Sequence, residues 1–272
     1  MSFTPDKRRT ARPVVILRTK KTGAFLLRNV EQWRPTKFVR VGDLLRASDV
    51  PAHVSVSSRF AADIVAPYYD RAIRDHAHGR LLDMGCGYVP LYDAYRDLVS
   101  ENICIDWQNT AHANPYLDQM VDLTGALPFE RGSFDTVLLT DVLEHIPEPS
   151  SLMCEIARIL RPGGKLILGV PFFYWLHEVP HDYFRYTEFA LRRFCEQSGL
   201  RVVELVPYGG LPEVLLDLIS KGLNFLHRPL AASLRPLHTI ASSLCKTMPV
   251  RTLSERTRSS VPLGYVLCAR KM

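Results

Sequence analysis

A glycine-rich turn is the first place in the chain where residue types and spacing could hold a ligand. Residues 81–87 read Leu-Leu-Asp-Met-Gly-Cys-Gly, an apolar run that ends in Gly85 and Gly87. Glycines allow a sharp turn and a close backbone approach to a ligand, and a helix that follows offers free N–H groups. A dinucleotide-binding turn has a third glycine where this chain has Pro90, so binding of a pyrophosphate is disfavoured.

Acidic residues follow the next apolar runs. Asp106 comes 21 residues after Gly85, where a carboxylate of an α/β nucleotide site accepts hydrogen bonds from both ribose hydroxyls. Asp122 follows a shorter run, and Asp141 comes at the end of a third. Because ligands of open α/β sheets bind beyond the carboxyl ends of the strands, these side chains are expected to line one crevice.

Residues 171–187 carry further reactive side chains, namely aromatic residues, two histidines, two carboxylates and an arginine. A histidine can accept a proton near neutral pH because an unperturbed imidazole titrates at about pH 6.5. His181 is therefore hypothesised to be a general base, with His177 as the alternative. The candidates for binding the substrate are Tyr174, Tyr183, Arg185 and Tyr186. The competing interpretation is structural: Arg185 pairs with Asp182 to pin the loop, and Tyr186 leads into the next helix.

The elements that would position these residues are read from periodicity. Short apolar runs predict strands at 80–84, 102–105, 119–121, 134–140, 165–170, 201–206 and 264–270. Helical spacing predicts helices at 60–76, 150–160 and 188–198. Strands that alternate with helices indicate a parallel sheet covered on both faces.

The two ends of the chain depart from this alternation. Residues 14–17 and 24–27 predict a small hairpin within a basic extension, 1–58, that precedes the main domain, 59–272. Residues 209–262 are expected to form a helical insertion before the last strand. Its first helix is amphipathic, with apolar positions such as Leu215 and Leu218 opposite Asp217 and Lys221. This pattern is typical of core packing or, beside basic residues, of contact with an anionic membrane surface.

Composition restricts the class of protein. Hydrophobic residues make up 47% and charged residues 23% of the chain, as in ordinary globular proteins. No apolar run reaches the roughly 18–20 residues of a membrane-spanning helix, and no signal-peptide pattern is present, so a cytoplasmic location is expected. The six cysteines are scattered without a C-x-x-C pair, which argues against a zinc site and a disulfide framework; no metal site is expected.

Charge is uneven along the chain. Residues 1–46 hold 12 Lys/Arg against 3 Asp/Glu, and residues 221–272 hold 9 against 1. The middle is acidic. Basic ends of this kind either balance the acidic middle or contact an anionic partner such as a phosphorylated substrate, a nucleic acid or a membrane surface.

Together the motifs resemble those of class I S-adenosylmethionine (SAM)-dependent methyltransferases, in the methyltransferase type 11-like group that acts on small molecules, quinones and glycans. The resemblance rests on residues 81–87, Asp106, residues 122–123, residues 140–146 (Thr-Asp-Val-Leu-Glu-His-Ile) and residues 161–164 (Arg-Pro-Gly-Gly). It spans about residues 60–208 and the last strand. It implies a doubly wound α/β fold with a seven-stranded, mostly parallel sheet. One departure is Val89, where many members have glycine.

The resemblance also implies roles for single residues toward SAM. Asp83, Gly85, Cys86 and Gly87 would surround the methionine part, whereas Asp106 and Trp107 would hold the ribose. Asp122 and Leu123 would flank the adenine, and Thr140, Asp141 and His145 would line the methionine end near the methyl group.

The expected activity is O-methylation of a small-molecule or glycan-like acceptor, with anionic and lipid-linked acceptors included. An amino-sugar N-methyltransferase, a nucleic-acid methyltransferase and a non-catalytic scaffold that keeps only the fold of a SAM-dependent enzyme are the alternatives. Nucleic acid is disfavoured because residues 140–143 read Thr-Asp-Val-Leu rather than the (N/D)-P-P-(Y/F/W) tetrapeptide of amine-modifying nucleic-acid enzymes. The expected partners are the acceptor and an anionic membrane surface contacted peripherally; the sequence leaves the oligomeric state open.

Overall fold

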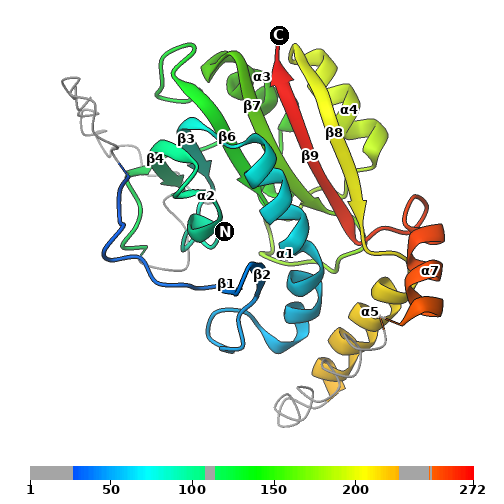
Figure 1. The fold of residues 1–272 in the computed structure, drawn as a ribbon. Helices are drawn as coiled ribbons and strands as arrows, with labels where there is room; N and C mark the ends of the chain where they lie inside the picture. Colours follow the sequence, from blue (N-terminus) through cyan, green and yellow to red (C-terminus); the bar gives the residue numbers. More distant parts are fainter. Residues whose placement is uncertain (1–26, 108–113, 227–244, 246) are drawn as a thin grey trace, which may run out of the picture.

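A seven-stranded sheet forms the centre of the protein (Figure 1). The computed structural model describes residues 27–107, 114–226, 245 and 247–272. The strands of the sheet are β3 (Gly79–Met84), β4 (Val99–Asp106), β5 (Gln119–Met120), β6 (Phe134–Thr140), β7 (Leu160–Pro171), β8 (Leu200–Tyr208) and β9 (Gly264–Lys271). Their order is β5-β4-β3-β6-β7-β9-β8, and only β9 runs antiparallel to its neighbours. The predicted seven-stranded, mostly parallel sheet is confirmed.

Helices cover both faces of this sheet. The structure has α1 (Val56–His76), α2 (Tyr92–Tyr95), η1 (Leu143–His145), α3 (Pro149–Ile159), α4 (Glu188–Gln197), α5 (Leu211–Leu226) and α7 (Met248–Thr257). One apolar core joins the sheet to α3 and α4, and a second joins it to α1 and α2. Adjacent strand residues alternate between the two cores, as Leu81 and Leu82 do in β3, because successive side chains of a strand point to opposite faces.

The described part of the basic extension is built into the second core rather than set apart from it. An antiparallel hairpin of β1 (Phe38–Val41) and β2 (Leu44–Ala47) turns at Gly42. Trp33 and Phe38 are buried with Tyr69 of α1. The boundary expected at residues 58/59 therefore falls inside α1, which begins at Val56 with Ser55 as its cap. The hairpin predicted at 14–27 lies outside the described residues, apart from Leu27.

Helix α5 inverts the pattern expected for core packing. Leu215, Leu218 and Ile219 are each about half exposed, at 50%, 50% and 54%. Asp217 and Lys221 are buried instead, at 0% and 2%. The reason is that these polar groups have partners inside: they form an ion pair one turn apart, and the Lys221 ammonium sits 3.4 Å from the centroid of the Tyr174 ring.

The predicted helical insertion before the last strand is present as α5 and α7, which lie beyond the carboxyl end of β8 (Figure 1). Among the helices of the described residues, none has the length and apolar character needed to cross a membrane.

Candidate cofactor and acceptor site

The glycine-rich turn lies directly after β3, against the end of β4. The N–H groups of Gly85 and Cys86 both donate to the carbonyl of Ile105. The Gly87 N–H donates to Asp106 Oδ2 at 3.0 Å, and the Trp107 N–H donates to Oδ1 at 2.8 Å. Burial raises the pKa of Asp106, partly offset by these two hydrogen bonds. The turn and the predicted ribose-binding carboxylate are therefore one hydrogen-bonded unit.

Val89 keeps the turn in the conformation that glycine usually provides. Its φ is +51°, a left-handed conformation that costs a residue with a Cβ roughly 1–2 kcal/mol. The side chain is fully buried, and the carbonyl accepts a hydrogen bond from Trp33 Nε1 at 3.0 Å. Burial and this bond from the N-terminal segment offset the strain, so the departure from the family pattern leaves the turn intact.

Asp83 and Cys86 support the turn from inside the protein. Asp83 is buried and accepts a hydrogen bond from the Tyr95 hydroxyl of α2; burial raises its pKa to about 8. Cys86 is 2% exposed. Both side chains are largely buried beneath the turn and support it from inside, and their direct contact with SAM stays a prediction.

Of the two residues expected around the adenine, one is exposed and the other is buried. Asp122 is exposed, and its Oδ1 accepts from the N–H and hydroxyl of Thr124 in a tight turn. Leu123 is buried in the core shared with α3. Of these two side chains, only that of Asp122 offers a polar atom, its second carboxylate oxygen, to a ligand beyond β5.

Asp141 follows Thr140 at the end of β6 and is held by two partners. Its carboxylate pairs with Lys37 Nζ at 2.8 Å and accepts from the Tyr69 hydroxyl at 2.9 Å. Tyr69 can approach because Gly169 in β7 has no side chain; a Cβ there would collide with the ring. Burial acts to raise the pKa of Asp141, but the Lys37 charge and the hydrogen bonds outweigh it and lower the pKa.

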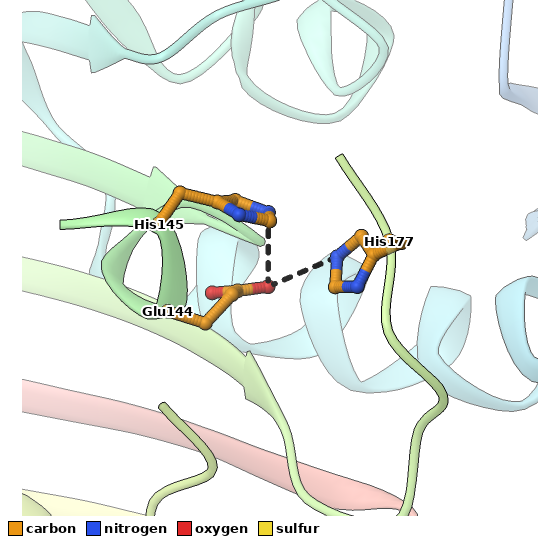
Figure 2. Close-up of side chains that lie close together, drawn as sticks. All are labelled: Glu144, His145 and His177. Carbon is orange, nitrogen blue, oxygen red and sulfur yellow. Dashed lines mark ion pairs between the residues drawn. The ribbon is translucent and has the colours of Figure 1, made fainter. Parts of the chain in front are cut away.

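Glu144, His145 and His177 form a cluster (Figure 2), and Glu144 and His177 line the same cavity as Asp141. Glu144 Oε1 lies 3.9 Å from His145 Nε2 and 3.8 Å from His177 Nε2. Glu144 is fully buried, and neither of its carboxylate oxygens has a hydrogen-bond partner. Burial raises the pKa of Glu144 well above its usual range, and the charge of Asp141 adds to the effect.

A cavity of about 140 Å³ opens beside this cluster, at the carboxyl edge of the sheet. Its polar lining includes Lys37, Asp141, Glu144 and His177. Its remaining lining is Ser58, Ala61, Ala62, Val65, Pro171, Tyr174, Glu178, Tyr208 and Leu263. A wider hollow of about 590 Å³ at the opposite edge is lined by Pro162, Gly163, Lys165, Arg201 and Arg270 among others. None of the predicted SAM-binding or acceptor-binding residues lines it, and we assign no chemistry to it.

The loop after β7 separates the two histidines that the sequence placed together. His177 lines the cavity, and burial lowers its pKa. His181 packs on Trp107 with ring centroids 5.0 Å apart, its Nδ1 lies 3.3 Å from the Tyr183 hydroxyl, and its carbonyl faces His145 Nδ1 at 2.8 Å. The preferred base, His181, is thus outside the cavity lining, and the alternative, His177, is inside it.

The four substrate candidates have different surroundings. Tyr174 lines the cavity and donates from its hydroxyl to Ser58 Oγ at 2.9 Å. Tyr183 is exposed. Arg185 and Tyr186 require correction, because the Arg185 guanidinium is occupied by both Asp182 oxygens and three backbone carbonyls. Tyr186 is buried with its hydroxyl on the Leu143 carbonyl. The structural interpretation of Arg185 therefore holds.

Lys37, Glu144 and Tyr208 are cavity residues that the sequence did not identify as functional. Lys37 is one of many basic residues in the extension and carries no motif. Glu144 lies inside a recognised motif directly before His145, which was the signal available in the sequence; the full burial of its carboxylate is seen only in the structure.

The turn fits the methionine and ribose of SAM on its own geometry. A Cβ placed on Gly87 would meet no atom within 4 Å, so a ligand can approach the backbone there. Each Asp106 oxygen has accepted one hydrogen bond, and a carboxylate has about four lone-pair sites. Two sites therefore remain for the ribose hydroxyls.

Comparisons with known proteins find similarity to methyltransferases. Residues 82–168 match the family model described as a methyltransferase domain. The chain is 34% identical over 111 residues to a ubiquinone biosynthesis O-methyltransferase of Xanthomonas oryzae, covering 37% of this chain and 46% of the relative. It is 30% identical over 156 residues to the protein of that name from Aromatoleum aromaticum, covering 47% and 66%. The chain thus spans about half the length of the first curated relatives it matches.

Solved structures agree on the fold. A SAM-dependent methyltransferase from Archaeoglobus fulgidus superposes with a TM-score of 0.50 at 15% identity, covering 79% of this chain and 97% of that one. A chain from the complex of the Haloferax volcanii Trm112 methyltransferase activator with a methyltransferase gives 0.50 at 19% identity, covering 79% and 96%. Residues 82–168 are thus similar to a methyltransferase domain, and the fold, the glycine-rich turn and the matched segment support a class I SAM-dependent methyltransferase with SAM as its cofactor.

Proposed function

We propose that the protein transfers the methyl group of SAM to a hydroxyl of a small molecule. The observation that carries the proposal is the position of the Gly87–Asp106 unit and the 140 Å³ cavity at the same carboxyl edge of the sheet. Methyl transfer from a sulfonium needs the acceptor oxygen held in line with the methyl carbon, and alignment of this kind is worth roughly 7–11 kcal/mol. SAM, when bound, supplies the methyl group.

The cavity favours a ring-sized acceptor group. A dry engineered cavity of about 150 Å³ holds one benzene molecule, so about 140 Å³ accommodates one ring or one hydroxyl-bearing end of a larger molecule. Tyr174 and Tyr208 supply aromatic walls. The small-molecule acceptors of O-methyltransferases such as the matched ubiquinone biosynthesis proteins support this choice. A glycan or lipid-linked acceptor would insert only its terminal part.

The Glu144–His145–His177 cluster is the group that takes the proton of the acceptor hydroxyl. Because its pKa is lowered by burial, the imidazole of His177 is neutral at neutral pH and has a lone pair. In the transfer, the oxygen–carbon bond forms as the carbon–sulfur bond breaks, the bonding pair stays on sulfur, and the hydroxyl proton passes to the cluster. An amine acceptor would need the same alignment, which keeps an amino sugar as the second candidate.

The test is calorimetric binding of SAM and S-adenosylhomocysteine, followed by transfer of a labelled methyl group to a panel of acceptors. We expect micromolar binding, and transfer to phenolic or vicinal-hydroxyl rings before amino sugars. Transfer only to amino sugars would select the N-methyltransferase. Absence of binding by either ligand would contradict the proposal and favour a non-catalytic scaffold.

A further inference from the structure

The Glu144–His145–His177 cluster has the arrangement of a metal site. One carboxylate oxygen and one ring nitrogen from each histidine lie within 4.8 Å of one another. In a tetrahedral zinc site with bonds of about 2.0–2.2 Å, ligand atoms are about 3.4 Å apart. The contacts of 3.8 and 3.9 Å from Glu144 are therefore about half an ångström wider than a closed coordination shell.

The ligand atoms of Glu144 and His145 have no other hydrogen-bond partner. Both oxygens of Glu144 and the Nε2 of His145 are buried and make no hydrogen bond. A buried carboxylate without a partner is costly, and such charges in proteins are paired or coordinate a metal. Glu178 Oε2, on the exposed side, lies 3.9 Å from the same His145 nitrogen and faces the cluster from solvent.

Each histidine is also oriented from behind. His145 Nδ1 faces the carbonyl of His181 at 2.8 Å, which places the ring proton on Nδ1 and leaves the lone pair of Nε2 toward Glu144. His177 Nδ1 lies 3.3 Å from Asp182 Oδ2, and Asp182 is itself held by both terminal nitrogens of Arg185. A carboxylate or carbonyl behind the ligating histidine is the usual outer shell of a protein metal site.

We propose that Glu144, His145 and His177 bind one divalent transition-metal ion, for which two imidazoles and a carboxylate favour zinc or a neighbouring first-row metal. The structure also explains why the sequence did not suggest it. Glu144 and His145 are adjacent in η1, whereas His177 comes from the loop after β7, so no short ligand spacing exists in the chain.

The metal deepens the proposed function and, in this respect, rests on it. Glu144 and His177 line the 140 Å³ cavity, so the remaining coordination positions face the place of the acceptor. With a metal bound, Glu144 and His177 would hold the ion and would no longer accept the acceptor proton themselves. An acceptor hydroxyl on the metal would instead have a lowered pKa and release its proton to water at neutral pH. The preferred acceptor is then one with a second oxygen beside the methylated hydroxyl, which can complete the coordination.

The experiment uses the full chain, treated with a chelator, dialysed and titrated with Zn²⁺ or Co²⁺ alone. We expect one equivalent per chain by calorimetry, and visible Co²⁺ bands of a four- or five-coordinate site. Glu144→Gln and His177→Gln should each weaken binding by about 100-fold or more, because even second-shell changes cost about 10–100-fold. Asp182→Asn should cause a smaller loss within that range. The matched control is His78→Gln, since His78 is exposed and far from the cavity lining.

Two outcomes would overturn the metal site: no stoichiometric binding by the wild-type chain, or equal binding by wild type and both ligand variants. His177 lies in a partly exposed loop, so His177→Gln is expected to fold, and circular dichroism checks this. S-adenosylhomocysteine binding is measured on the same samples. Binding of S-adenosylhomocysteine without metal binding would reject the metal site and leave the methyltransferase proposal standing. Metal binding without S-adenosylhomocysteine binding would support the metal site and reject the methyltransferase proposal.

Discussion

Asp106→Ala tests whether the turn after β3 binds the ribose of SAM. In the free protein, Asp106 accepts hydrogen bonds from the Gly87 and Trp107 N–H groups, and the proposed complex adds both ribose hydroxyls. Hydrogen bonds to a charged group contribute about 1.5–3 kcal/mol each. Because Asp106 is only partly buried, we take the lower value, which gives a loss of about 3 kcal/mol, or about 150-fold in Kd.

The assay is calorimetric titration with S-adenosylhomocysteine and with its 2′-deoxyribose analogue. If Asp106 binds the ribose, the wild type should lose affinity for the deoxy ligand, and Asp106→Ala should discriminate much less between the two ligands, because coupled changes are not additive. Asp106→Asn keeps one acceptor oxygen but loses the charge, so its affinity for S-adenosylhomocysteine should lie between those of the wild type and Asp106→Ala. Binding by a folded Asp106→Ala within about threefold of wild type would refute the ribose assignment.

Three further predictions concern the surroundings of the site. Lys37→Met should lower the free energy of unfolding by about 1 kcal/mol, since the Lys37–Asp141 pair is about one-third exposed. The pKa of Asp141 is lowered and that of Lys37 raised by their pairing against opposing burial. The difference in unfolding free energy between wild type and Lys37→Met should therefore persist between about pH 4 and pH 10. It should vanish as pH falls through the pKa of Asp141 or rises through the pKa of Lys37. Urea unfolding at a series of pH values measures this difference, and a pH-independent value would contradict the prediction. Lys221→Met should lower the free energy of unfolding by about 3–5 kcal/mol, because it leaves Asp217 buried without its partner. The double variant Asp217→Leu/Lys221→Met should recover most of this loss, as measured by thermal unfolding. Equal losses in the single and double variants would show that the pair is not coupled. If α5 contacts an anionic membrane, the double variant Leu218→Asp/Ile219→Asp should cosediment less with anionic vesicles than the wild type does. The controls are neutral vesicles and Leu98→Asp, a substitution at another exposed site. Unchanged cosedimentation would reject α5 as the contact.

Most of the fold could be predicted from the chain because its signals are local. The strand 134–140 was predicted at the observed bounds, and helix 188–198 differs from α4 by one residue. Alternating strands and helices require a parallel sheet, since a parallel connection needs a crossover. The β1–β2 hairpin was missed because residues 38–47 mix exposed apolar and charged side chains, which hides the period of two.

Helix α5 shows the limit of periodicity. The spacing correctly predicted a helix with an apolar and a polar face, but not which face lies inside. Burial of Asp217 and Lys221 depends on their mutual ion pair and on the Tyr174 ring from a loop about forty-five residues earlier. Partners at such a distance in sequence leave no trace in the pattern of one helix.

By itself the sequence determined the proposed SAM-binding end of the site, because turn and carboxylate each follow a strand and a parallel sheet brings those ends together. Only the tertiary structure decided the proposed acceptor end. There Lys37 reaches Asp141 from 104 residues away, His177 rather than His181 meets Glu144, and Arg185 is consumed by its own loop. Side chains on loops are positioned by the contacts that the folded chain makes around them, and spacing along the chain carries no record of those contacts.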